Sequence, residues 1–312
     1  MLEIFANILP VFIIVAIGYG AVKSGYLSSE IATSLNSVTI RLAVPVLLFR
    51  SMYNLDFEET FNLPLLFSFY IGAVASFILS GLIARYFFHR KPGEAVAIGF
   101  CAVFSNTVLL GIPIIGRTMG SDALPLMFGI IAFHAPSLYA MGITTMEFAR
   151  RDGRSLFQTL TFSIKSVFAN PLMIGILLGV MVNLMSVQLP TVLEASIDMI
   201  ARAAIPLALI GIGAAITGYQ LNSRASETIT VSLITLVFHP ALVFLISYYL
   251  FELPMKYVQI AVILAAMPPG LNIYIFAVMY KRAVSLSAST IIVATISSIF
   301  TISGWFWFLS RF

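Results

Sequence analysis

Charged side chains are scarce in this chain of 312 residues, since only 10% are Asp, Glu, Lys or Arg while 60% are apolar. A soluble globular protein carries about 25% charged and roughly 45–50% apolar residues. Too few charges are therefore present to cover a water-facing surface, which excludes the soluble classes. The mean hydropathy of +1.02 agrees with a protein that lies in a bilayer.

Cysteine and histidine are also rare. Cys101 is the only cysteine, which excludes an internal disulfide and a cysteine metal cluster, and the three histidines are His89, His134 and His239. Neither a Walker sequence, an HExxH zinc motif nor a GxSxG elbow occurs. We therefore expect no catalytic residue, no metal site, no cofactor and no ATP-driven transport by this chain alone.

Long apolar runs fill most of the chain. A membrane-spanning helix needs about 20 apolar residues, and these runs are too continuously apolar for the alternating strands of a membrane barrel. We therefore predict an all-α polytopic membrane protein with ten transmembrane helices. The predicted spans cover residues 4–22, 35–53, 64–88, 95–116, 123–147, 163–185, 196–218, 228–251, 257–280 and 285–309.

The basic residues are distributed unevenly between the predicted loops. Loops after odd-numbered spans hold eleven Lys and Arg residues, whereas loops after even-numbered spans hold four, with the C-terminus included. Because cytoplasmic loops carry the basic excess, we place the odd loops in the cytoplasm and both termini outside. The formal net charge of +4 thus reports topology, and we expect no nucleic-acid partner.

The two halves of the chain are similar to each other. Five spans precede the basic loop and five follow it, so the halves must have opposite orientations in the membrane. We predict inverted repeats at residues 1–149 and 163–312, joined by a cytoplasmic linker at 150–162, as in many secondary transporters. The matches pair Phe5-Ala6-Asn7 with Phe168-Ala169-Asn170, Arg41 and Pro45 with Arg202 and Pro206, and the Asn106–Pro113 stretch with Pro268–Asn272.

Proline and glycine interrupt the fourth and ninth spans at matching places. Unwound backbone at membrane depth is tolerated only inside protein or beside a watery cavity, and half-helices carry free N–H groups and partial positive charge at their N-termini. We therefore predict two broken helices that cross near the midplane and form an anion-binding site; the alternative is that the prolines only kink packed helices. The site residues proposed on this basis are Asn106, Thr107, Gly111, Pro113, Pro268, Pro269, Gly270 and Asn272.

Three stretches carry a resemblance to a known family. They are the start of the chain, with Gly18-Tyr-Gly, Gly25-Tyr-Leu and Ala43-Val-Pro45-Val-Leu-Leu-Phe49; Phe104-Ser-Asn106-Thr-Val-Leu-Leu-Gly111-Ile-Pro113; and Ala265-Ala-Met-Pro268-Pro-Gly270-Leu-Asn272. Together they resemble the auxin efflux carrier family of ten-span transporters, over nearly the whole chain. Val108 stands where the family usually has glycine.

The resemblance implies a fold like that of sodium/proton antiporters or bile-acid symporters. It implies a scaffold domain of spans 1, 2, 6 and 7, a transport domain of spans 3–5 and 8–10 that moves like an elevator, and a homodimer through the scaffold. It further implies small organic anions as substrates: auxin for the plant carriers, and malonate or malate-type dicarboxylates for bacterial members. The short central loop resembles that of bacterial members, so we expect the bacterial inner membrane.

Two kinds of side chain are candidates for substrate contact. Asn106 and Asn272 can donate hydrogen bonds to a carboxylate without burying a charge, or can simply cap the broken helix ends. Arg41 and Arg202 are related by the repeat, and an arginine inside a span is a candidate functional residue. Alternatively, Arg202 pairs with Asp198 one turn earlier, and Arg41 extends to the membrane surface.

Two histidines are candidates for coupling transport to an ion gradient. His134 and His239 lie near the predicted midplane, and histidine changes charge around neutral pH, so either can carry a coupled proton or can be a neutral packing residue. We favour His134, because its span belongs to the predicted mobile domain. No buried acidic residue presents itself as a sodium ligand, so sodium coupling is the weaker alternative.

The leading interpretation is a secondary active transporter of a small carboxylate, with malonate or a related dicarboxylate as the first candidate. A carrier of aromatic, auxin-like monocarboxylic acids is the main alternative. An anion channel needs a pore lined by rings of charge or carbonyls, and a membrane enzyme needs clustered acid, base or metal groups. Both fit the sequence less well.

Overall fold

The computed structural model describes residues 2–55, 62–150, 161, 171–218 and 224–312. In these ranges the regular structure is helical and contains no strand beyond one isolated bridge. Seven of the described helices are long and apolar enough to cross a membrane, and three further apolar helices are shorter. The prediction of an all-helical polytopic membrane protein is thereby confirmed.

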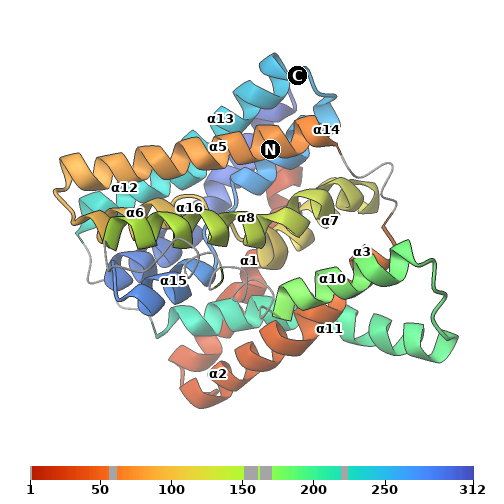
Figure 1. The fold of residues 1–312 in the computed structure, drawn as a ribbon. Helices are drawn as coiled ribbons and strands as arrows, with labels where there is room; N and C mark the ends of the chain where they lie inside the picture. The colour runs from red at the N-terminus through yellow and green to blue at the C-terminus, as the bar shows by residue number, and fades with distance from the viewer. Residues whose placement is uncertain (1, 56–61, 151–160, 162–170, 219–223) are drawn as a thin grey trace.

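The helices form two groups that are distinguished by their packing (Figure 1). The first helix group contains α1 (Leu2–Lys23), α2 (Ser29–Val38), the π-helical turn η1 (Thr39–Ala43), α3 (Val44–Tyr53), α10 (Pro171–Leu184) and α11 (Thr191–Ile216). The second helix group contains α5 (Leu63–Leu82), η2 (Ile83–Phe87), α6 (Pro92–Cys101), η3 (Thr107–Gly111), α7 (Ile112–Thr118), η4 (Ser121–Ala123), α8 (Leu124–Arg150), α12 (Ala225–Leu233), η5 (Ile234–Phe238), α13 (His239–Leu245), η6 (Ile246–Leu250), α14 (Met255–Ala265), α15 (Asn272–Tyr280) and α16 (Val284–Leu309).

Glycine allows helices of the first group to approach closely. A side chain at Gly18 of α1 would collide with the carbonyl of Ile210 on α11, and one at Gly213 of α11 would collide with the carbonyl of Val15 on α1. Small residues serve the same purpose throughout membrane proteins, where the helices gain little from hydrophobic burial and depend on close packing. The α1–α11 pair is therefore held backbone against backbone.

An asparagine fixes the end of α3 to α10. The Nδ2 group of Asn183 donates to the carbonyls of Met52, Tyr53 and Leu55, at 3.1, 2.7 and 2.9 Å. The last carbonyls of a helix have no partner within the helix, so this amide supplies a donor to two of them, those of Met52 and Tyr53, at the C-terminal end of α3. The contact makes α3 and α10 a single unit.

Polar side chains also tie together the second helix group. Arg90, just before α6, pairs with Glu227 at the start of α12 at 2.8 Å, and with Glu94 at 3.3 Å. Glu227 is only 1% exposed, so its charge needs this partner. Tyr70 of α5 donates to the carbonyl of Ile130 on α8 at 2.7 Å.

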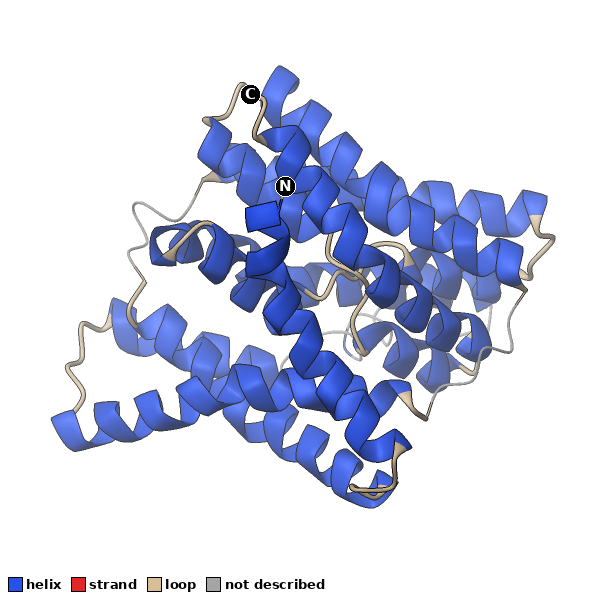
Figure 2. Cartoon of the chain, turned by 180° about the vertical axis from the view of Figure 1, so that it is seen from behind, coloured by secondary structure: helices blue, strands red, loops and turns tan. Residues whose placement is uncertain are grey.

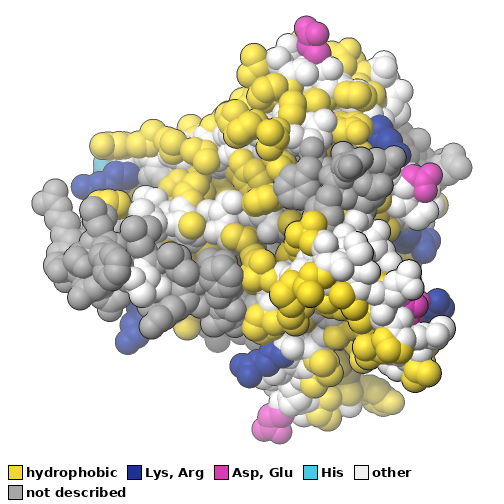
Figure 3. Space-filling view, turned by 45° about the vertical axis from the view of Figure 1, so that its right-hand side comes forward, with side chains coloured by type: hydrophobic (Ala, Val, Ile, Leu, Met, Phe, Trp, Pro, Cys, Tyr) yellow, Lys and Arg dark blue, Asp and Glu magenta, His cyan; other side chains and the backbone are white. Residues whose placement is uncertain are grey.

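The two groups meet along α1, which packs against α7 and α16 as well as α11 (Figure 2). A continuous apolar core joins α1, α3 and α11 to α7, α8 and α14. In the space-filling view, apolar side chains cover much of the described surface, and charged side chains gather toward its edges (Figure 3). This distribution suits a protein surrounded by lipid.

The glycine contact predicts a difference between two neighbouring positions of α1. We expect Gly18→Ala to lower the free energy of unfolding in detergent by about 1–3 kcal/mol, and with it the melting temperature, because the new methyl group forces α1 away from α11. Gly20→Ala is the matched control, since no atom lies within 4 Å of a side chain placed there. Equal melting temperatures for the two variants would contradict the packing described here.

Candidate functional site

Two helices of the second group are interrupted in the interior of the protein. Residues 102–106 separate α6 from η3, and residues 266–271 separate α14 from α15. The second interruption contains Pro268, Pro269 and Gly270, as predicted, whereas the first precedes the predicted stretch and shares only Asn106 with it. Pro113 stands in the first turn of α7, where its missing N–H costs no hydrogen bond, and Gly111 lies close to Leu264.

The two unwound segments pair with each other as a short antiparallel bridge. Asn106 donates its backbone N–H to the carbonyl of Pro268 at 2.8 Å, and Gly270 donates to the carbonyl of Phe104 at 3.2 Å. Proline has no N–H to satisfy, so Pro268 and Pro269 themselves present only carbonyls. Because unpaired backbone groups are costly at membrane depth, each break stabilises the other.

The two asparagines have their oxygen atoms already occupied. Oδ1 of Asn106 accepts from the backbone N–H of Leu109 at 3.2 Å, which caps the helix that begins with η3. Oδ1 of Asn272 accepts from the hydroxyl of Tyr139 on α8 at 3.1 Å. Within the described residues, the Nδ2 groups of both amides have no acceptor. The capping role considered for Asn106 is thus present, and it leaves the donor end of the amide available.

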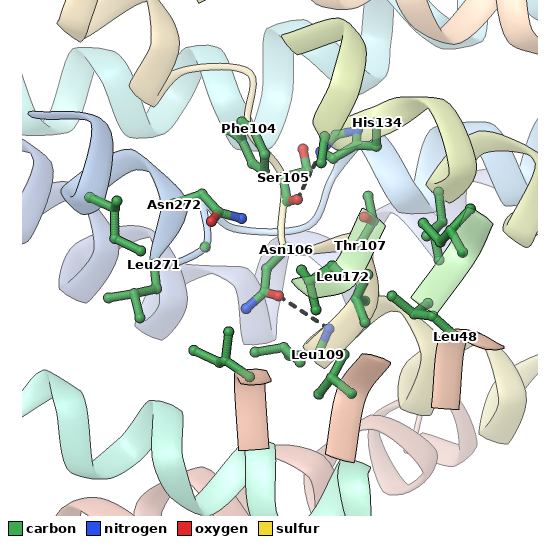
Figure 4. Close-up of a pocket in the computed structure, with 18 residues that line it drawn as sticks. Leu48, Phe104, Ser105, Asn106, Thr107, Leu109, His134, Leu172, Leu271 and Asn272 are labelled. Atoms are coloured by element: carbon green, nitrogen blue, oxygen red, sulfur yellow. Dashed lines mark hydrogen bonds between the residues drawn. The ribbon is translucent and has the colours of Figure 1, made fainter. Parts of the chain in front are cut away.

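Both amides line one cavity of about 80 Å³ (Figure 4). It lies between the paired segments, α8 and the first helix group, and its volume exceeds that needed for a single water. No Asp, Glu, Lys or Arg is among its described lining residues, whereas the N-termini of η3 and α15 open onto it. The lining includes Ile40, Val44, Leu48, Phe104, Ser105, Asn106, Thr107, Ile131, His134, Leu172, Gly270, Leu271 and Asn272.

His134 is the titratable side chain of this cavity. Its Nε2 lies 3.0 Å from the carbonyl of Ser105, and because a carbonyl only accepts, Nε2 carries the proton. The ring packs edge-on against Phe69 and Phe104, with centroids 5.7 and 5.0 Å apart. His239 also packs against Phe69, at 5.5 Å, but it is not among the residues that line the cavity.

The structure does not bring the two candidate arginines to this cavity. Arg41 and Arg202 are both exposed, and Arg202 lines a separate cavity between α3, α8 and α11. The predicted pairing of Arg202 with Asp198 is wrong, because Asp198 pairs with Arg50, whose Nη2 lies 3.0 Å from Oδ2. Since α3 packs beside α11, an arginine from a neighbouring helix takes the place of the one on the same helix.

Two residues of the site were missed at the sequence level. Ser105 supplies the carbonyl that faces His134, but a backbone carbonyl leaves no trace in residue type. Tyr139 follows His134 by five residues on α8, and its contact with Asn272 depends on how two distant helices pack. Gly270 was predicted as a site residue. A Cβ atom at this position would lie 3.4 Å from Cγ of Asn106, so a side chain there would press on that amide.

The fold and the site define the class of this protein. It is an all-helical, multi-pass membrane protein with two interrupted helices that meet at one cavity. The chain belongs to the membrane transport protein family, which matches residues 3–306, and the resemblance to the auxin efflux carriers is thereby confirmed. The family and the relatives it resembles are transporters and not enzymes.

Three relatives illustrate how wide the similarity is. An "uncharacterized transporter" of Methanothermobacter thermautotrophicus is 27% identical over 303 residues, which cover 96% of each chain. A "putative malonate transporter" of Rhizobium meliloti is 23% identical over 304 residues, or 97% of this chain and 95% of the relative. An "uncharacterized transporter" of Methanocaldococcus jannaschii is 23% identical over 311 residues, or 97% of each.

The ion pair between α3 and α11 predicts which charges are coupled. In a double-mutant cycle on thermal stability, we expect Arg50→Ala and Asp198→Ala to show a coupling energy of about 0.5–1 kcal/mol, typical of half-exposed pairs. The matched cycle of Arg202→Ala with Asp198→Ala should give a coupling energy near zero. A larger coupling energy for Arg202 with Asp198 than for Arg50 with Asp198 would contradict the ion pair described here and would favour the pair within α11.

Proposed function

We propose that this protein is a secondary active transporter that moves a small organic anion, a carboxylate, across the membrane by elevator-type alternating access. The observation that carries the proposal is the pair of amide Nδ2 donors, from Asn106 and Asn272, at one cavity beside two interrupted helices. An ionised carboxylate is an acceptor-only group, so it is complementary to a site that offers donors.

The strength of such a site is suited to transport. Neutral amides bind an anion without a full opposite charge, so the substrate is also able to leave. Each helix N-terminus contributes roughly +0.5 of an elementary charge, and two of them face the cavity, which supports recognition of about one negative charge. Gly111, Thr107, Pro113, Pro269 and Gly270 shape this site through the backbone and need not touch the substrate themselves.

Malonate is the first candidate substrate. The Rhizobium meliloti relative is described as a "putative malonate transporter", and a small dicarboxylate can place one carboxylate on the amides. The apolar lining, with Leu48, Phe104 and Ile131, favours the alternative of an aromatic monocarboxylic acid. A channel would show no saturable exchange of substrate. An enzyme would convert its ligand into a product.

Inverted repeats at residues 1–149 and 163–312 explain a symmetry of the backbone. Of the seven described residues with positive φ, six form pairs that are 161 or 163 residues apart: Gly25 with Ser186, His89 with Glu252, and Gly120 with Ala283; Lys281 is the seventh. The π-helical turns η2 and η6 end at Phe87 and Leu250, again 163 apart. Such conformations are uncommon for residues other than glycine, so their recurrence supports two copies of one five-span unit.

The two helix groups supply the two parts that an elevator needs. In our proposal the first helix group is the scaffold, which is stiffened by glycine contacts and Asn183, and the second helix group carries the substrate. The cavity lies at their boundary, which supports a substrate carried past a fixed surface. We place the protein in a bacterial inner membrane, with both termini periplasmic and as a homodimer through the scaffold.

We propose that a proton drives transport and that His134 carries it, with sodium coupling and His239 as the weaker alternatives. The ring of His134 lines the cavity and donates a hydrogen bond to the carbonyl of Ser105, the residue before Asn106. A change of charge at His134 would therefore act directly on the paired segments.

The first test is uptake of labelled malonate into proteoliposomes, with and without an inward-acid pH gradient. We expect saturable uptake that the gradient stimulates. Asn106→Ala and Asn272→Ala should each reduce the initial rate at least roughly tenfold, since hydrogen bonds to a charged group contribute about 1.5–3 kcal/mol. Asn7→Ala, an amide on α1 remote from the cavity, is the control. Near-normal uptake in both site variants would overturn the proposed site.

A second test concerns the proton. We expect His134→Gln to abolish stimulation by the pH gradient while exchange of labelled for unlabelled malonate continues, because glutamine can still donate to the Ser105 carbonyl but cannot carry charge. His239→Gln, at a histidine away from the cavity, should keep the stimulation. If both variants retain a full response to the gradient, neither histidine carries the coupled proton.

A further inference from the structure

A second, larger cavity lies at the boundary between the two helix groups. Its volume is about 470 Å³, and it is enclosed by α3 and α11 on one side and by α7, η4 and α8 on the other. Its polar lining residues are Arg50, Ser51, Asn54, Ser121 and Arg202. Asn54 follows α3, and Ser121 precedes α8. Both lie in connections that the distribution of basic residues places outside the cell.

The cavity has an excess of positive charge. Arg50 is neutralised by Asp198, and Glu194, the next acidic residue on α11, accepts from the hydroxyl of Tyr53 at 3.0 Å. Arg202 is exposed and has no carboxylate partner among the described residues, and the described lining contains no Asp or Glu. A guanidinium group in a recess between helices attracts and can bind a carboxylate in a forked geometry.

This cavity and the cavity at Asn106 and Asn272 follow one another along the same three elements. On α3, Ser51 lines the outer cavity and Leu48 the inner one. On the helix formed by η3 and α7, the corresponding residues are Ile112 and Leu109, and on α8 they are Phe128 and Ile131. Residues three apart on a helix are separated by about 4.5 Å along its axis.

Only apolar side chains stand between the two cavities at these three elements. Leu48, Ile112, Phe128 and Ile131 are 0%, 5%, 7% and 2% exposed and belong to one hydrophobic cluster, so they form an apolar layer. An anion cannot pass such a layer until the helix groups move relative to each other. The polar recess outside the layer is therefore a place where an anion would wait.

We propose that the cavity at Arg202 is an outer vestibule that captures a small carboxylate before it enters the site at Asn106 and Asn272. Arg202 supplies the charge that attracts and holds the anion, and the layer of Leu48, Ile112, Phe128 and Ile131 is the barrier that separates the two positions. The inference rests on the proposed function for its ligand and direction, but the exposure of the vestibule to the outside can be tested without transport.

Kinetics of malonate uptake into intact cells test the role of Arg202. We expect Arg202→Gln to raise KM about 3- to 10-fold at low ionic strength with the maximal rate unchanged, the effect of one lost charge near a solvated ligand. Arg202→Lys should retain most of the affinity, and added salt should raise KM for the unchanged protein more than for Arg202→Gln. Lys256→Gln removes an exposed positive charge that does not line the cavity, and it should leave KM unchanged. An unchanged KM in Arg202→Gln would overturn the capture role.

Thiol labelling tests the vestibule independently of any substrate. In a Cys101→Ala background, we expect Arg202→Cys to react with a membrane-impermeant thiol reagent added outside the cells, whereas Lys23→Cys, in a predicted cytoplasmic loop, reacts only after permeabilisation. Labelling of Arg202→Cys from the inside alone would refute an outer vestibule. If labelling occurs from outside but the unchanged protein takes up no malonate, the vestibule stands and the substrate of the proposed function is wrong.

Discussion

The pairing of two unwound segments is the constraint on which the rest of the structure depends. A helix that stops inside a membrane leaves N–H and C=O groups without partners, and lipid cannot supply them. Here the N–H groups of Asn106 and Gly270 find the carbonyls of Pro268 and Phe104 across the break. Neither break is tolerable alone, so both must lie at the same depth. This requirement brings Asn106 and Asn272 to one cavity although 166 residues separate them in sequence.

The surrounding helices hold that cavity at a boundary. Helices of the first group are fixed to one another by backbone contact at glycines and by the amide of Asn183. The second group carries the paired segments and is tied at one end by Arg90 and Glu227. When the two walls of a site belong to different helix groups, relative movement of the groups changes access to the ligand. The apolar layer that includes Ile112 and Phe128 closes one of the routes.

Sequence reasoning succeeded where a residue type acts on its own backbone. It predicted the break at Pro268-Pro269-Gly270 and the long apolar helices, but it placed the first break at Asn106–Pro113, whereas the unwound residues are 102–106 and Gly111 and Pro113 lie in the helix that follows. It failed where the partner comes from another helix. Asp198 pairs with Arg50 instead of Arg202, and Tyr139 holds Asn272, because α3 packs on α11 and α8 packs near α15. A single sequence does not contain those neighbours, and the π-helical turns have no residue signature either.

Counterflow is the measurement that tests the central claim most directly. Proteoliposomes loaded with unlabelled malonate would be diluted into labelled malonate, with the unchanged protein, Asn106→Asp and Asn272→Asp compared. The account predicts transient, saturable accumulation of label that both aspartates abolish, because a carboxylate in place of the donor amide repels the anion while the backbone pairing persists. Accumulation of label that persists at the normal rate in both variants would contradict a carboxylate site at the crossing.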